Sequence, residues 1–324
     1  MIEEEPVTED AIGTRTPVRC PRCGYDLRGE IASWGRSCPL EGVCAECGLE
    51  IAWRELLNPV LIKPRWCVEY AGSSWRVPGR AVRTLMAMCW PWYFWRSLRM
   101  VHEIRWRRVR GCLLFWAFAL YLLFCACHAA LMFSQWSAWG LRMPAKLAHP
   151  LDVLMAAVLP ASDSLPWKGV SALSPCDVLV EIWVPVVIVP VLPFAVIHLL
   201  SASGFVTLPV SRRRARVRWA HIGRILLYGL GWFVPVIALT LLGVALSEMH
   251  RLPVLPGLGR LLIVLAAVAL WSHLPFLVIW WSTATGRYLK MRHPWGVGLA
   301  VVAMAGLLTL VVPLVYALLA WRVP

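Results

Sequence analysis

Long runs of apolar residues fill the last two thirds of the chain and predict membrane-spanning helices. At about 1.5 Å per residue, roughly 20 apolar residues are needed to cross the hydrocarbon layer of a bilayer as a helix. Five runs reach that length, at residues 111–133, 178–200, 225–246, 261–282 and 298–320. We therefore expect a mainly α-helical protein with a five-helix transmembrane bundle within residues 111–324.

A shorter apolar stretch, Thr84–Trp95, precedes these runs and is bounded by Arg83 and Arg96. As a helix it would extend only about 18 Å, which is too short to cross the membrane. Its tryptophans and flanking arginines are typical of a segment that lies on the membrane surface. Residues 58–110 are therefore predicted to form a basic interfacial connector rich in Trp and Arg, with a re-entrant half-helix as the alternative.

The first 57 residues have a different pattern. Residues 1–17 are acidic and lack apolar periodicity, so a disordered lead-in is expected. Residues 18–57 contain paired cysteines and are predicted to form a small compact unit. The chain does not open with a basic segment followed by an apolar one, so we expect no cleaved signal peptide.

Composition and charge agree with a membrane protein. Of the 324 residues 59% are hydrophobic and only 15% are charged, which is more apolar than a soluble domain of this length requires. The net charge is +14, but residues 1–60 hold eleven acidic against six basic residues. This acidic head argues against nucleic-acid binding, because phosphate contacts need clustered bases. The basic residues beside the apolar runs, above all in Ser211–Arg224, instead suit a topology signal and contacts with anionic lipid headgroups.

The basic residues between the predicted spans indicate the orientation of the bundle. Fifteen of them fall on one side and six on the other. The fifteen are Arg96, Arg99, Arg105, Arg107, Arg108, Arg110, Arg212, Arg213, Arg214, Arg216, Arg218, Arg224, Arg287, Lys290 and Arg292. Because loops rich in Lys and Arg stay in the cytoplasm, we expect a multipass protein of the cytoplasmic (inner) membrane. Its N-terminus would be cytoplasmic and its C-terminus outside.

Four cysteines of the head have the spacing of a metal site. Cys20 and Cys23 form one CxxC pair, Cys44 and Cys47 form a second, and a glycine follows each pair. Two such turns supply the four thiolates of a tetrahedral structural zinc site, and the glycines permit the positive φ that the turns need. Rubredoxin-like iron uses the same ligands and stays open as the alternative. Cys38 belongs to neither pair, so we leave it out of the ligand set and its role open.

The head also resembles a known family. The segments CPRCGYDLRG, CAECG and LEIAW are similar to the zinc-ribbon head of planctomycete-type multipass membrane proteins, in which a CPxCGYDLRG opening precedes variable membrane segments. The resemblance covers about residues 18–57. It implies the ligands Cys20, Cys23, Cys44 and Cys47 and the membrane context, and it implies no reaction, because the function of that family is uncharacterised.

Few ionisable residues lie within the predicted spans. Counted along straight helices at about 1.5 Å per residue, His198 lies near 3 Å and His273 near 14 Å from the cytoplasmic ends, so the two are expected at different depths. His128 and Glu181 share a level near the outer face and could form a polar site. Prolines punctuate the later spans, as they do in the broken helices of transporters.

These patterns favour a binding or assembly role. We expect a structural zinc ribbon on the cytoplasmic side that contacts an unknown protein partner. A transporter or channel with proline-broken helices is the first alternative, and a membrane enzyme with a site near His128 and Glu181 is the second. The sequence contains no P-loop, GxSxG or HExxH motif, so we expect no enzyme.

Overall fold

The structure, a computed structural model, describes residues 18–34, 37–58, 62–138, 185, 187–207, 217–249 and 254–320. The N-terminal part comprises α1 (Arg28–Ala32), β1 (Glu41–Val43), β2 (Glu50–Ala52), α2 (Trp53–Leu57), the 3-10 helices η3 (Val68–Tyr70) and η4 (Ser74–Arg76), α3 (Val77–Met88) and α4 (Pro91–Ser97). The helical part comprises α5 (Trp106–Ala138), α8 (Val189–Ser201), α9 (Gly204–Thr207), α11 (Trp219–Gly229), η7 (Leu230–Trp232), α12 (Phe233–Ser247), α13 (Val254–Trp271), α14 (His273–Thr283), the π-helix η8 (Ala284–Tyr288) and α15 (Pro294–Ala320). The protein is mainly helical, as predicted.

Among the described residues, four helical segments are long and apolar enough to cross a membrane. They are Trp106–Leu131, Trp219–Ser247, Val254–Trp271 and Pro294–Val311, and each overlaps one predicted span. The remaining predicted span, residues 178–200, lies partly outside the described residues, and its described part is the 13-residue helix α8. Four candidate spans support a membrane protein, whereas the predicted count of five stays a prediction.

The predicted span 261–282 is divided differently in the structure. Helix α13 ends at Trp271 and α14 begins at His273, with Ser272 between them. Pro275, in the first turn of α14, has no backbone N–H to donate, so the helical hydrogen bonding is interrupted there. The apolar helix α13 also begins earlier than predicted, at Val254.

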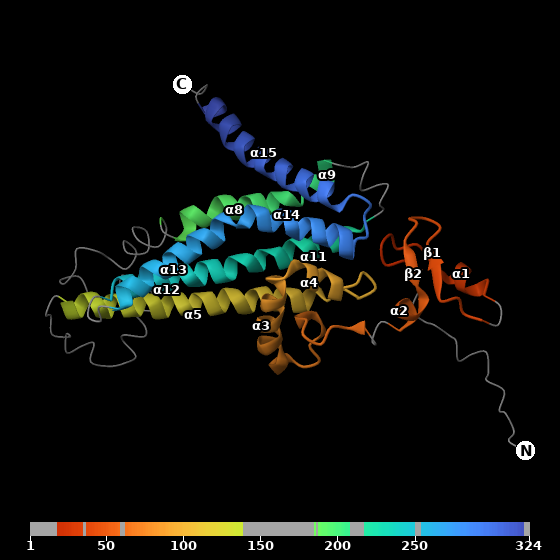
Figure 1. Cartoon of the computed structure of the whole chain (residues 1–324), viewed down its shortest axis with the longest axis horizontal. Helices are drawn as coiled ribbons and strands as arrows, with labels where there is room; N and C mark the ends of the chain where they lie inside the picture. Colours follow the sequence, from red (N-terminus) through yellow and green to blue (C-terminus); the bar gives the residue numbers. More distant parts are fainter. Residues whose placement is uncertain are drawn as a thin grey trace, which may run out of the picture.

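The long helices lie side by side. Figure 1 shows α5, α8, α12 and α13 running roughly along the long axis, while α15 leaves the others at an angle. Helix α12 packs against α13 and α5, and α15 packs against α14 and α8. Small residues allow α12 and α13 to approach closely, since a Cβ atom at Gly259 would lie only 2.3 Å from the Ser247 nitrogen.

Residues 18–57 form a small unit at one end of this bundle (Figure 1). Its two-stranded antiparallel sheet pairs Glu41 with Ala52 and Val43 with Glu50. Trp53 is buried beneath the sheet, with Trp34 edge-on at a ring distance of 4.6 Å. One hydrophobic cluster runs from this unit into the end of the bundle, so the unit packs on the helices.

The predicted surface segment Thr84–Trp95 is not a single helix. It spans the end of α3 and the start of α4, with a turn at Cys89 and Trp90. Phe94 and Trp95 are fully buried against Trp280 of α14, at ring distances of 5.3 and 4.9 Å. Trp90 is 68% exposed, whereas the interfacial position of the segment stays a prediction. One face of the segment therefore belongs to the core of the helical bundle.

Candidate metal centre

Each CxxCG segment folds into a tight turn that directs two sulfurs to one side. The Gly24 amide donates to the Cys20 carbonyl at 2.8 Å, and the Gly48 amide donates to the Cys44 carbonyl at the same distance. Gly24 has φ +83° and Gly48 has φ +64°, a region that side-chain-bearing residues avoid. The expected role of both glycines is thereby confirmed.

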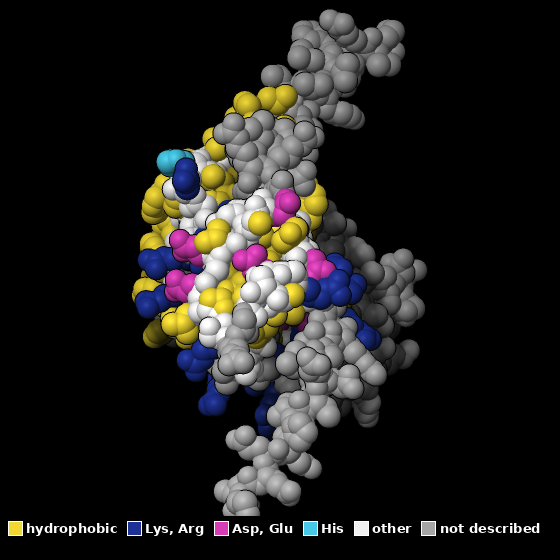
Figure 2. All heavy atoms as spheres, turned by 90° about the vertical axis from the view of Figure 1, so that its right-hand side faces the viewer, with side chains coloured by type: hydrophobic (Ala, Val, Ile, Leu, Met, Phe, Trp, Pro, Cys, Tyr) yellow, Lys and Arg dark blue, Asp and Glu magenta, His cyan; other side chains and the backbone are white. Residues whose placement is uncertain are grey.

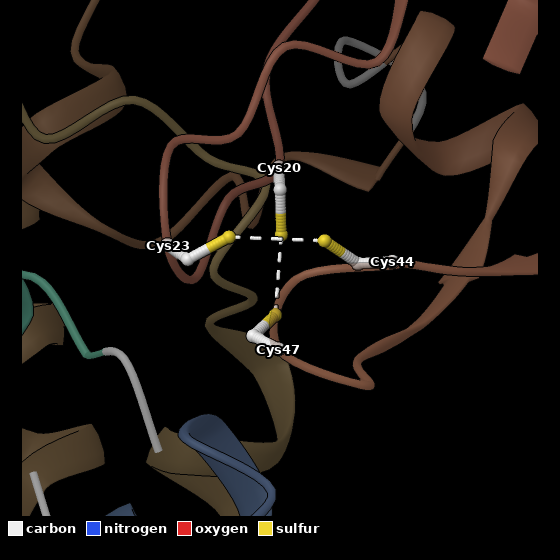
Figure 3. Close-up of side chains that lie close together, drawn as sticks. All are labelled: Cys20, Cys23, Cys44 and Cys47. Carbon is white, nitrogen blue, oxygen red and sulfur yellow. Dashed lines mark hydrogen bonds between the residues drawn. The ribbon is translucent and has the colours of Figure 1, made fainter. Parts of the chain in front are cut away.

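The two turns face each other and bring the four predicted ligands together. The Sγ atoms of Cys20, Cys23, Cys44 and Cys47 all lie within 4.8 Å of one another and point toward a common centre (Figure 3). The Cys20–Cys47 and Cys23–Cys44 sulfur pairs are 3.6 and 3.7 Å apart. A tetrahedral site with metal–sulfur bonds of about 2.3 Å separates its sulfurs by about 3.8 Å. The cluster therefore has the size of a site that could hold a metal ion.

The pKa shifts within the cluster differ in direction: burial is outweighed at Cys44 by hydrogen bonds from Cys47 and the other cysteines, which lower the pKa of Cys44. Burial raises the pKa of Cys20 to about 11 and raises that of Cys47 further, so these groups stay protonated at neutral pH without a positive charge nearby. A bound metal ion supplies that charge and displaces the protons. Cys38, by contrast, is exposed, and its Sγ contacts the Pro39 carbonyl at 3.4 Å. It lies outside the cluster, which supports leaving it out of the ligand set.

The first metal turn is fastened to the helical part of the protein. The carbonyl oxygen of Pro21, between ligands Cys20 and Cys23, lies 2.7 Å from Nε2 of His221 on α11. The Arg218 amide donates to the Arg22 carbonyl of the same turn at 3.3 Å. A carbonyl only accepts, so Nε2 of His221 carries the hydrogen.

His221 continues this connection inward to a buried ion pair. Its Nδ1 is then an acceptor, and the Tyr288 hydroxyl donates a hydrogen bond to it at 2.7 Å. The Tyr288 oxygen accepts from Nη1 of Arg224 at 3.1 Å, and Nε of Arg224 donates to Glu69 at 2.8 Å. A chain of hydrogen bonds thus leads from Pro21 to Glu69.

The Glu69–Arg224 pair is completely buried and well supplied with partners. Both side chains have 0% exposure. The Tyr228 hydroxyl donates to Glu69 at 2.7 Å, and Nη2 of Arg224 donates to the Tyr70 hydroxyl at 2.8 Å. Such partners offset the large cost of removing two charges from water.

This ion pair was not predicted from the sequence. Arg224 was expected in the loop before the third predicted span, but it lies on α11 and its side chain is fully buried. The available signal was the position of Glu69, an isolated acid in the otherwise uncharged segment WCVEYAG. Nothing in the sequence pointed to its partner 155 residues away.

The histidines of the bundle are placed differently from the prediction. His198 and His273 were expected at different depths, yet their rings lie 5.4 Å apart and both are fully buried. Nε2 of His198 meets the Leu226 carbonyl at 3.0 Å. Nδ1 of His198 and both ring nitrogens of His273 have no hydrogen-bond partner among the described residues.

The predicted site at His128 and Glu181 stays a prediction, because the structure describes only one of the two residues. His128 is buried and stacks on Phe124 at a ring distance of 6.0 Å. Glu181 lies outside the described residues.

Comparison with protein families, with curated proteins and with solved structures finds no match for this chain.

Proposed function

We propose that the chain is a multipass protein of the cytoplasmic membrane that carries a structural zinc ribbon on its cytoplasmic side. The convergence of the four Sγ atoms within 4.8 Å is the observation that carries this proposal. Zinc is proposed because it favours a tetrahedral set of thiolates in structural sites and needs no redox partner. The cytoplasm keeps such thiols reduced. The likeness of residues 18–57 to the planctomycete-type heads supports the same ligand set.

The ribbon is proposed to be a fixed platform for binding or assembly. Under this proposal the protein has no enzymatic activity. The contacts of Pro21 with His221 and of Arg22 with Arg218 support a ribbon held at one orientation. Its outer surface presents apolar side chains, with Leu40 84% and Val43 59% exposed. Side chains of this kind suit contact with another protein.

Affinity purification in mild detergent tests the platform role. We expect proteins that co-purify with the wild type to be lost with Cys44→Ser, because the variant lacks one ligand of the site. Cys38→Ser removes an exposed thiol outside the cluster and is the matched control. The same set of proteins with both variants would show that the ribbon does not recognise them.

A transporter or channel is a second candidate, and one observation favours it. His198 and His273 place ring nitrogens without partners inside an apolar bundle. Ionisable groups within a membrane often mark the path of an ion or a proton. Flux of ions or protons in proteoliposomes that disappears with His273→Ala would support this function.

A further inference from the structure

A cleft separates the ribbon from the end of the helical bundle. Its volume is about 420 Å³, within the range typical of sites for small ligands. One side is formed by β1, β2 and α2 of the ribbon. The other is formed by the end of α4 with the segment after it and by the π-helix η8 with the residues after it. None of the four cysteines of the metal cluster lines the cleft, although Pro21 of the first metal turn does.

The two walls of this cleft carry opposite charges. The ribbon contributes Glu41, Glu50 and Glu55. The helical part contributes Arg96, Arg99, Arg287 and Lys290. Arg99 and Glu55 form an ion pair with each other, and within the described residues none of the other five forms one. Figure 2, which looks onto this end of the molecule, shows acidic and basic side chains intermixed.

The basic wall has an unusual backbone. Arg287 and Tyr288 belong to a π-helical turn, a geometry frequent at functional sites. Lys290 has φ +51° and is the one residue other than glycine with a positive φ in the described part of the chain. That conformation costs on the order of 1 kcal/mol. Hydrogen bonds from Leu289 to Ala284 and from Met291 to Thr285, both 2.9 Å, hold the turn in this shape.

Several residues of the cleft also lie close in the sequence to the ends of candidate spans. Arg96 and Arg99 precede α5, and Lys290 lies between α14 and α15, so the lining comes from the ends of candidate spans. Tyr288 at its base is fixed by His221 and Arg224. A ligand in the cleft would thus contact residues anchored to both the ribbon and the bundle.

We propose that this cleft binds the headgroup of a zwitterionic phospholipid that carries a phosphate and a primary ammonium group, as in phosphatidylethanolamine. Arg96, Arg287 and Lys290 would hold the phosphate, since charge-assisted hydrogen bonds to phosphate favour Arg and Lys. Glu41 and Glu50 would accept hydrogen bonds from the ammonium group. A purely anionic headgroup would meet repulsion from these carboxylates, and a quaternary ammonium group has no hydrogen to donate to them.

This inference rests on the proposed ribbon, because the ribbon supplies the acidic wall. The test therefore uses the full-length, metal-loaded protein and measures its metal content in every variant. Lipid retention is compared by native mass spectrometry after exposure to mixed micelles containing phosphatidylethanolamine, phosphatidylcholine and phosphatidylglycerol. We expect phosphatidylethanolamine to be retained in preference to the other two.

Two pairs of substitutions separate the roles of the walls. Arg287→Gln with Lys290→Gln should weaken binding of phosphatidylethanolamine by about tenfold or more, through loss of phosphate contacts. Glu41→Gln with Glu50→Gln should weaken phosphatidylethanolamine and strengthen phosphatidylglycerol, reversing the preference. Arg76→Gln with Arg83→Gln removes the same charge away from the cleft and should leave the preference unchanged.

Equal retention of the three lipids by a metal-loaded wild type would overturn the headgroup site and leave the zinc ribbon standing. Loss of the metal from the wild type would instead overturn the proposed ribbon. Displacement of phosphatidylethanolamine by an equal concentration of soluble phosphoethanolamine would contradict a lipid as the occupant. Retention that requires the acyl chains supports it.

Discussion

The Pro21 carbonyl and the His221 imidazole meet at 2.7 Å, although 200 residues separate them in the chain. Pro21 lies within a metal-binding turn, and His221 lies on the first helical turns of a candidate span. The contact therefore joins the ribbon to the helical bundle. Because His221 also accepts from Tyr288, its removal would break one hydrogen bond to the ribbon and one to the bundle.

Replacement of His221 by Ala is expected to loosen the ribbon from the bundle. An unpaired buried polar group costs about 1–3 kcal/mol. His221→Ala removes the donor to the Pro21 carbonyl and the acceptor of the Tyr288 O–H, although the Tyr288 oxygen still accepts from Arg224. Thermal unfolding in detergent should show the loss of stability, and limited proteolysis should release the ribbon faster. His293→Ala, at an exposed histidine, is the control. Equal proteolysis of both variants would argue that the contact does not hold the ribbon.

Glu69→Gln is expected to destabilise the protein strongly. It keeps the size of the side chain but leaves the buried Arg224 charge without its counter-charge, at a cost of about 3–5 kcal/mol. The double variant Glu69→Leu with Arg224→Met removes both charges and should recover much of that loss. The unfolding free energies of Glu69→Leu, Arg224→Met and their combination form a double-mutant cycle that measures the coupling between the two residues. Additive losses in the double variant would contradict a direct interaction.

His102 should make the stability depend on pH. Burial, with the nearby charges of Arg224, Lys63 and Arg99, lowers the pKa of His102 from 6.5 to about 4. The folded state then binds fewer protons than the unfolded state, so stability is complete above pH 6.5 and falls as the pH drops toward 4. Between pH 7.5 and 6 the expected loss is about 1 kcal/mol.

Thermal unfolding of the wild type and of His102→Gln across this interval checks the effect of pH. The variant should lose less stability than the wild type as the pH falls. Parallel curves for the two proteins would assign the pH dependence to other groups.

His273→Phe is expected to stabilise the bundle. Both ring nitrogens of His273 lack partners among the described residues, and Phe233 and Phe276 lie at ring distances of 4.7 and 6.1 Å. A phenyl ring fits such aromatic surroundings without an unsatisfied polar group. The melting temperature in detergent should rise, while the exposed His293→Phe should not change it. A fall for His273→Phe would indicate that the histidine has a partner that contributes to stability.

Local patterns in the sequence predicted the elements that depend on short spacings. The paired CxxCG turns, their positive-φ glycines and four apolar helices follow from composition within about 30 residues. The boundary at Ser272 was not predicted, although Pro275 was a local signal for it, because the apolar run continues on both sides of the interruption.

Contacts between distant segments could not be predicted in this way. The burial of Arg224 beside Glu69 depends on how η3 packs against the start of α11, which no local pattern encodes. The closeness of His198 and His273 could not be predicted either, since counting along straight helices placed them at depths about 11 Å apart. The packing of α8 against α14 brings their rings to 5.4 Å.

Metal analysis of the purified full-length chain tests the four-cysteine site most directly. Elemental analysis by mass spectrometry should find about one zinc ion per chain in the wild type and in Cys38→Ser, and almost none in Cys44→Ser. A wild-type chain without bound metal, or a Cys44→Ser chain that retains as much metal as the wild type, would contradict the site.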